Sequence, residues 1–255
     1  MKLFVQWYLK MLVKIIIARH RPEVIGITGS TNKTVVKKQV ANVLRTRFTV
    51  LENFRSYNTE IGLPLAVLEM PSGNRSIAAW VAVLMRGTIK ALFGTQFPQK
   101  LVIEYGVDAP GKMDYLLSIV RPTVVIVTDV EPVYQESFGS VDALAREYAK
   151  LVAATPPKGT VILNFDNEHV RILSRVSVAP VVFVSAVSPQ DDLSVTSEHD
   201  TAKTSLVITV ASKQYPYILQ SRGQHFVLAI LCAVRIAQFY SIETETAIAA
   251  LNNSL

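Results

Sequence analysis

Cysteine and charged residues are scarce in this 255-residue chain. Its one cysteine, Cys232, excludes a disulfide framework and any cysteine-rich metal site, and its neighbours in "AILCAVRIA" predict a buried helical position. Charged residues make up 18% of the chain and hydrophobic residues 50%, which excludes a disordered protein and permits a large core. A single thiol also fits a reducing, cytoplasmic location.

The first 19 residues lack an apolar run long enough to cross a bilayer. Lys10 and Lys14 interrupt "MKLFVQWYLKMLVKIIIAR", and no clear secretory cleavage site follows. Polar residues recur every four positions, at Lys2, Gln6, Lys10 and Lys14, which predicts an amphipathic helix with one polar stripe. This helix either lies in a membrane surface with its lysines among the headgroups, or packs on the domain or on a partner domain.

The net charge of +6 suits anionic ligands or an anionic membrane surface and specifies neither. We therefore expect a cytoplasmic protein, with a peripheral membrane contact through residues 1–19 as one possibility. We expect no nucleic-acid partner.

Apolar, β-branched runs alternate with helical patterns from residue 22 onward. Strands are expected at 23–28, 100–106, 123–130, 160–165 and 180–186, and helices at 33–45, 76–93, 111–120 and 140–154. This alternation predicts a three-layer α/β domain with a mostly parallel sheet. The stretch 205–219 predicts an antiparallel hairpin near the sheet edge, and a helix pair follows at 224–239 and 243–251. We thus expect an N-terminal helix at 1–21 and one domain at 22–255.

The stretch "VIGITGSTNKT" predicts a strand that runs into a phosphate-binding loop and a helix. A helix N-terminus attracts phosphate because its free N–H groups and the positive end of its dipole meet there. Gly29 lets the backbone approach an anion, Lys33 would reach the β- and γ-phosphates, and the Thr34 hydroxyl would sit on Mg²⁺. The candidate nucleotide-binding residues of the loop are Gly29, Ser30, Thr31, Asn32, Lys33 and Thr34.

Asn32 stands directly before the lysine, where such loops place glycine. Asparagine tolerates a positive φ better than most residues, so the loop shape can survive, but its side chain can crowd a phosphate. An ordinary strand–turn–helix with an exposed lysine is the alternative for this stretch.

Polar side chains also follow the next predicted strands. Glu104 ends the second strand, Asp129 and Glu131 end the third, and Asn164 and Asp166 end the fourth. In open parallel sheets, ligands bind beyond the carboxyl ends of the strands. Together with the loop, these side chains predict a magnesium–nucleotide site.

Five stretches follow one another in a characteristic order. They are "VIGITGSTNKT", "YNTEIGLPLAVL", "LVIEYGVDAPGKMDYLLSIVRPTVVIVTDVEP", "GTVILNFDN" and "RGQHFVLAILCAVRIA". These stretches resemble the motifs of the central ATP-binding domain of the Mur ligases, and they cover residues 22 to about 251. They are most similar to the branch of the family that adds D-alanyl-D-alanine to a muramoyl tripeptide.

The resemblance implies an ATP-dependent amide ligase of peptidoglycan precursor synthesis. In that family ATP phosphorylates a carboxylate, an amine attacks the acyl phosphate, and Mg²⁺ neutralises charge during the transfer. By position, Lys33 matches the phosphate-binding lysine, and Thr34 and Glu104 match Mg²⁺ ligands. The resemblance thus makes Lys33 and Glu104 the candidate catalytic residues.

Three further residues match family positions around the substrates. Asn58 matches an asparagine near the substrate channel, and Asn164 and Asp166 fall in a motif beside the nucleotide. By this resemblance, we expect one helix in place of the family's N-terminal sugar-nucleotide domain and no C-terminal ligase domain within residues 1–255. Ligation would therefore need a separate C-terminal domain or a partner chain, unless the sequence is a fragment of a longer ligase.

Four functional positions of the family are changed, and Asn32 is the first of them. Tyr134 stands where the family places a metal-binding histidine, and Tyr148 stands where it places a lysine that is carbamylated to hold the second metal. Ala229 stands where an asparagine contacts adenine. The resemblance thus implies ATP with one Mg²⁺ site and argues against a second. The alternative function is a catalytically impaired relative that binds nucleotide or acts as a scaffold at the membrane surface.

Overall fold

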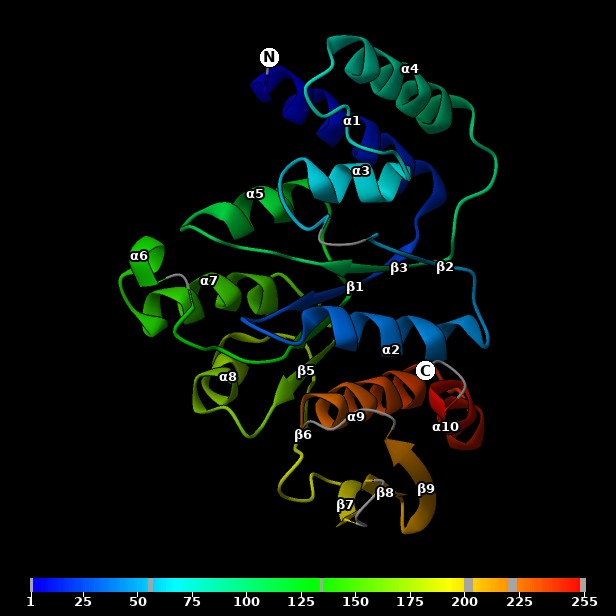
Figure 1. Cartoon of the computed structure of the whole chain (residues 1–255), viewed down its shortest axis with the longest axis vertical. Coiled ribbons are helices and arrows are strands. Elements are labelled where there is room, and N and C mark those ends of the chain that lie inside the picture. The colour runs from blue at the N-terminus through cyan, green and yellow to red at the C-terminus, as the bar shows by residue number, and fades with distance from the viewer. Residues whose placement is uncertain (1, 55–56, 134, 200–203, 220–223, 253–255) are drawn as a thin grey trace.

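The computed structural model describes residues 2–54, 57–133, 135–199, 204–219 and 224–252. Its centre is a six-stranded parallel sheet with the strand order β2-β3-β1-β4-β5-β6 (Figure 1). The strands are β1 (Glu23–Thr28), β2 (Val50–Glu52), β3 (Lys100–Glu104), β4 (Val124–Val127), β5 (Thr160–Asn164) and β6 (Val181–Val184). Helices cover both faces of the sheet, which confirms the predicted three-layer α/β architecture.

The two faces of the sheet carry separate sets of helices (Figure 1). One face is covered by α1 (Lys2–His20), α3 (Gly62–Leu68), α4 (Ile77–Phe93), α5 (Lys112–Ile119), α6 (Gln135–Phe138), α7 (Val141–Ala153), α8 (Glu168–Ile172) and a 3₁₀ turn (Leu173–Val176). The other face is covered by α2 (Lys33–Arg45), α9 (Gln224–Phe239) and α10 (Thr244–Asn252). All four residues of β4 are buried, because a parallel strand covered on both faces must be apolar on both sides.

A second, three-stranded antiparallel sheet consists of β7 (Leu193–His199), β8 (Thr204–Val210) and β9 (Lys213–Leu219). The predicted antiparallel hairpin is therefore present as β8 and β9, in a sheet separate from the main one. Strand β8 also pairs with β7, a strand that was not predicted from the sequence. The hairpin's apolar side chains, among them Leu206, Ile208 and Tyr217, join the core under α9 and α10. This burial fixes the small sheet below those helices.

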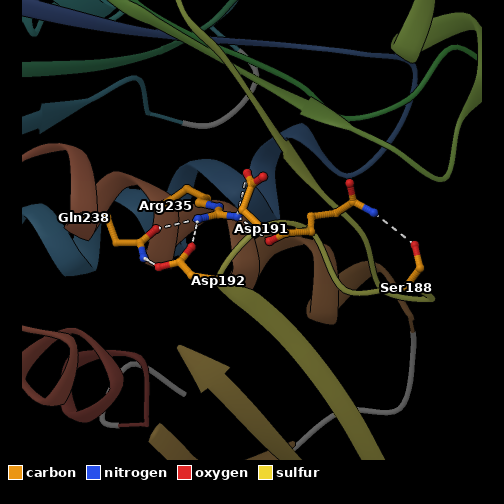
Figure 2. A network of polar contacts seen from close by, with 6 residues as sticks. Ser188, Asp191, Asp192, Arg235 and Gln238 are labelled. Carbon is orange, nitrogen blue, oxygen red and sulfur yellow. Dashed lines mark hydrogen bonds and ion pairs between the residues drawn. The ribbon is translucent and has the colours of Figure 1, made fainter. Parts of the chain in front are cut away.

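Arg235 of α9 binds the segment between β6 and β7 and so connects it to the helices α2, α9 and α10 (Figure 2). Its guanidinium is nearly buried, pairs with Asp192 and Asp191, and donates 2.7 Å to the carbonyl of Gln190. Gln238, one turn further along α9, accepts from Arg235 and donates 2.8 Å to Asp192. A buried cation is tolerated only when paired and hydrogen-bonded, and the two carboxylates meet that need.

Helix α1 packs on the domain through one face. Val5, Leu9, Val13 and Ile16 of this face are buried in the core shared with α3, α4 and α5. The polar stripe is divided between two environments, because Lys2 and Lys14 are exposed, whereas Gln6 is buried and Lys10 donates 2.6 Å to a serine of α5. No helix within the described ranges combines the length and hydropathy needed to span a membrane.

The packing of α1 can be tested with two leucines of the same helix. Leu9 is fully buried and Leu3 is 81% exposed. Leu9→Ala is expected to lower the free energy of unfolding by about 2–5 kcal/mol, because the substitution leaves a cavity. Leu3→Ala serves as the control and should change it by less than about 0.5 kcal/mol. Urea unfolding followed by circular dichroism measures both, and equal effects would show that α1 is not packed on the domain.

Candidate functional site

The loop between β1 and α2 has the backbone conformation that its sequence predicts. Gly29 has a φ of 144°, and a Cβ added there would lie 2.0 Å from the Thr128 hydroxyl oxygen, so only glycine fits. Asn32 adopts the left-handed conformation, with a φ of 64°, at the start of α2. The asparagine thus preserves the loop shape in the absence of the usual glycine.

An internal carboxylate binds this loop. Asp129, which follows β4 and is almost buried, accepts 2.7 Å from the backbone N–H of Thr31 through Oδ1. Its Oδ2 accepts from the Thr31 hydroxyl and, at 3.3 Å, from the Asn32 side-chain amide. Within the described residues, the backbone N–H groups of Lys33 and Thr34 have no hydrogen-bond acceptor. The first turn of α2 can therefore receive an anion, but Asp129 already holds part of the loop.

Lys33 is folded back over the loop. Its ammonium donates 2.6 Å to the carbonyl of Gly29 and 3.1 Å to that of Ser30. Burial lowers the pKa of Lys33 below its ordinary value, while the carboxylates of Glu104 and Asp129 act in the opposite direction. Asp129 contacts Thr31, two residues before Lys33, and Glu104 pairs with Lys37, one turn after it, so these three predicted site residues lie at the same edge.

Glu104 is held in a buried ion pair. Its side chain is 2% exposed, and its Oε1 lies 2.9 Å from the ammonium of Lys37. Lys37 also donates 2.6 Å to the carbonyl of Asn53, whose side chain accepts 3.0 Å from the backbone N–H of Glu104. Neither Lys37 nor Asn53 was predicted as a site residue from the sequence. Lys37 follows Lys33 by four residues and so shares its helix face, which is a signal that could have found it.

Two side chains at this edge, Glu104 and Thr34, carry oxygen atoms of the kind that would hold a magnesium ion. Glu104 Oε1 is buried against the Lys37 ammonium, so a metal ion at this carboxylate would have to share it with that ion pair. Thr34 adds an exposed hydroxyl on the first turn of α2. Mg²⁺ prefers such oxygen ligands and usually takes further ones from phosphate and water.

The described residues contain no group of three or more His, Cys, Asp or Glu side chains arranged to hold a metal. Tyr148, at one of the changed family positions, is buried in α7 within the core, where its ring packs among apolar side chains. Tyr134 lies outside the described residues. Ala229 is fully buried in α9, and burial raises the pKa of the nearby Cys232 thiol to about 12, as fits a structural cysteine.

The other predicted residues occupy three different places. Asn164 donates 2.8 Å to the carbonyl of Thr128 and so lies beside the loop. The carboxylate of Asp166 turns to the segment after β6, where it accepts from Ser185 and, at 2.7 Å, from a backbone N–H. Asn58 accepts 3.0 Å through its carbonyl from the N–H of Gly106, just beyond β3.

The Mur ligase middle domain matches residues 88–237, which is more than half of the sequence. This chain belongs to the Mur ligase family. Members of the family use ATP, and one solved structure of similar fold, MurF from Thermotoga maritima, is a complex with ADP. That structure has a TM-score of 0.74 and 18% identity, over 97% of this chain and 52% of its own length.

Two further comparisons describe this Mur ligase domain. The UDP-N-acetylmuramoyl-tripeptide–D-alanyl-D-alanine ligase of Mycobacterium bovis is 28% identical over 229 residues, which are 89% of this chain and 40% of that protein. A crystal structure of MurF from Acinetobacter baumannii has a TM-score of 0.78 at 18% identity, over 98% of this chain and 50% of that one. The chain therefore spans about half the length of these relatives.

Substitution of Asp129 tests whether its charge beside the loop of this Mur ligase domain weakens the binding of ATP. Asp129→Asn keeps an oxygen that can accept from Thr31 but removes a negative charge beside the loop. We expect the Kd for ATP to fall about five- to tenfold, because like charges at short range repel. Titration calorimetry with Mg²⁺ measures the change.

Asp142→Asn is the matched control for this test, because Asp142 is 73% exposed at the start of α7. It should leave the affinity unchanged. Weaker binding by Asp129→Asn would mean that this carboxylate assists the nucleotide, and the interpretation of Asp129 as a competitor would be wrong.

Proposed function

We propose that this chain is the ATP-binding middle domain of a Mur-type amide ligase that joins D-alanyl-D-alanine to a muramoyl peptide in peptidoglycan precursor synthesis. The observation that carries the proposal is the proximity of Lys33 to the carboxylates of Glu104 and Asp129 at one edge of the sheet, in a chain of this family. The names of the relatives supply the substrate class.

The site residues have the following proposed roles. Lys33 leaves the loop carbonyls and binds the β- and γ-phosphates of ATP. The N–H groups at the start of α2, from the loop 29–34, hold the phosphates, and Asn164 and Asp166 lie beside the nucleotide. Thr34 and Glu104 hold one Mg²⁺, which neutralises charge on the transferring phosphoryl group.

The proposed reaction has two steps. The γ-phosphoryl group of ATP is transferred to an oxygen of the acceptor carboxylate, which gives an acyl phosphate and ADP. The amine then attacks the acyl carbon, the C–O bond to phosphate breaks, and inorganic phosphate leaves with the bonding electrons while the amine loses a proton. Asn58 lies on the side of the acceptor peptide in this proposal.

The chain is proposed to act with a second component. We treat residues 1–21 as a helix attached to a middle domain at 22–255, and we infer that a separate C-terminal ligase domain or a partner chain supplies the amine. The soluble nucleotide substrate fits a cytoplasmic protein.

Two substitutions in the loop test nucleotide binding in opposite directions. Lys33→Ala is expected to raise the Kd for ATP at least tenfold, because charge-assisted hydrogen bonds to phosphate are lost. Asn32→Gly is expected to lower it, because the loop keeps its left-handed residue while the side chain that crowds the phosphate is removed. Titration calorimetry with and without Mg²⁺ is the measurement.

Lys158→Ala, an exposed lysine on the loop before β5, is the control for the loss of positive charge and should have no effect. Because Asn32 and Asp129 both disfavour phosphate, we expect the wild-type Kd to lie above the micromolar range. A sub-micromolar value would refute the argument from crowding and charge.

Ligation itself should be slow in the native chain. Tyr134 and Tyr148 cannot replace a metal-binding histidine and a carbamylated lysine, so we expect no turnover from the purified chain with ATP, muramoyl peptide, D-alanyl-D-alanine and an added C-terminal domain. The double substitution Tyr134→His with Tyr148→Lys should give measurable phosphate release that depends on both substrates.

Native turnover in the usual enzyme range of about 1–1,000 per second would show that the tyrosines are no obstacle. ATP binding without ligation in either protein would favour a nucleotide-binding scaffold.

A further inference from the structure

Helices α1 and α4 form the outermost layer on one face of the sheet (Figure 1). The Tyr8 hydroxyl lies 2.8 Å from that of Thr88, and Leu12 packs against Gly87, where an added Cβ would lie 3.1 Å from the leucine. Further along, Arg19 donates to carbonyls in the last turn of α4 and just beyond it. The two helices therefore run side by side.

Exposed apolar side chains concentrate on this layer. Ten of the sixteen large hydrophobic residues that are exposed in the described part of the chain belong to these two helices. They include Leu3, Phe4 and Trp7 of α1 and Met85, Ile89 and Phe93 of α4. More than half of each of Trp7, Met85 and Ile89 is exposed to solvent, at 55%, 62% and 58%. Most of the surface of these residues is therefore available for contact with another molecule. We name these exposed side chains the α1–α4 face.

The exposed residues of the two helices adjoin one another. Phe4 lies one turn before Tyr8 and stacks on its ring, with 5.9 Å between centroids. On α4, Met85 lies about one turn before Thr88. Because Tyr8 and Thr88 are in contact, the apolar side chains on both sides of them lie next to each other. Soluble proteins rarely expose large apolar patches unless the patch binds something.

The positive charge of α1 and α4 indicates that the partner of this face is anionic. The two helices hold six of the chain's 26 Lys and Arg residues and none of its 20 Asp and Glu residues. The rest of the chain is therefore balanced, with 20 of each sign, so the whole net charge of +6 comes from this layer. Lys2 and Lys14 of α1 and Arg86 of α4 are exposed, and they accompany the apolar side chains.

We propose that the α1–α4 face binds the surface of a membrane that contains anionic lipids. Phe4, Trp7 and Phe93 are of the residue types that favour the boundary between headgroups and acyl chains, and the lysines and arginines would contact the lipid phosphates. A second copy of the chain is disfavoured as the occupant, because self-association of this face would bring together two layers with exposed Lys2, Lys14 and Arg86 and no acidic residue of their own. The proposal does not depend on nucleotide binding or ligation.

The test uses the full chain and sedimentation with phosphatidylcholine vesicles that contain or lack phosphatidylglycerol. The wild-type protein should sediment with the anionic vesicles, sediment weakly with the neutral ones, and lose binding as salt is added. Trp7→Ser with Ile89→Ser should lower the partition coefficient at least tenfold. Lys14→Gln with Arg86→Gln should lower it about fivefold per charge on anionic vesicles only.

Val178→Ser with Val187→Ser is the matched control, because both valines are exposed apolar residues outside this layer. This variant should bind as the wild type does. All the substituted side chains lie largely outside the core, and thermal unfolding verifies that each variant folds. Size-exclusion chromatography without lipid reports self-association.

Two kinds of result would overturn the proposal. The first is a failure of the folded wild-type protein to sediment with anionic vesicles, or equal binding by the Trp7/Ile89 variant. The second is a dimer in the absence of lipid that this variant converts to a monomer while vesicle binding is negligible, since the face would then be covered by another copy of the chain.

Discussion

The parallel pairing of β1 with both β3 and β4 is the constraint on which the site depends. In this register Ile27 lies opposite Glu104, and Thr28 lies opposite Val127, so the three strands end at the same edge. The loop after β1, the carboxylate that ends β3 and the carboxylate that follows β4 are brought together by this edge alone. Strands β1 and β4 are buried except for Glu23 at the start of β1, and they maintain the pairing because both of their faces are covered.

Charge is already balanced at this edge before any ligand binds. Lys37 neutralises Glu104 inside the core, while Lys33 lies within range of both Glu104 and Asp129. If a nucleotide binds here as proposed, each of these groups would have to exchange a protein partner for a phosphate or a metal ion. The affinity for a nucleotide would then be the difference between the interactions within the protein that are lost and those with the ligand that are gained. Such a difference is sensitive to a single charge such as that of Asp129.

The two faces of the sheet separate the two proposed activities. The helix that begins at the phosphate loop, α2, packs with α9 and α10 on one face, whereas α1 and α4 form the outer layer on the other. A membrane bound at the α1–α4 face would therefore not cover α2. Catalysis on soluble nucleotide precursors and attachment to a lipid surface are thus compatible in one chain.

The sequence by itself determined the elements whose signals are local. The apolar runs at β1 and β4 and the helical periodicity of α2, α7 and α9 depend on neighbouring residues, and these elements lie where they were expected. The shape of the loop after β1 was also predictable, because glycine and asparagine adopt a positive φ more readily than other residues, as Gly29 and Asn32 do here. The three residues of β2 and the seven of α3 were missed because so short a segment has too few positions to show a period.

Only the tertiary structure decided the contacts between distant residues. Thr31 meets a carboxylate 98 positions away, and Lys37 pairs with Glu104 because β3 lies beside β1 under α2. The pairing of the hairpin with β7, away from the main sheet, was also settled by which apolar faces could be buried together. Such contacts leave no periodic trace in the sequence, because their free energy depends on burial and on partner distance, which exist only after the chain has folded.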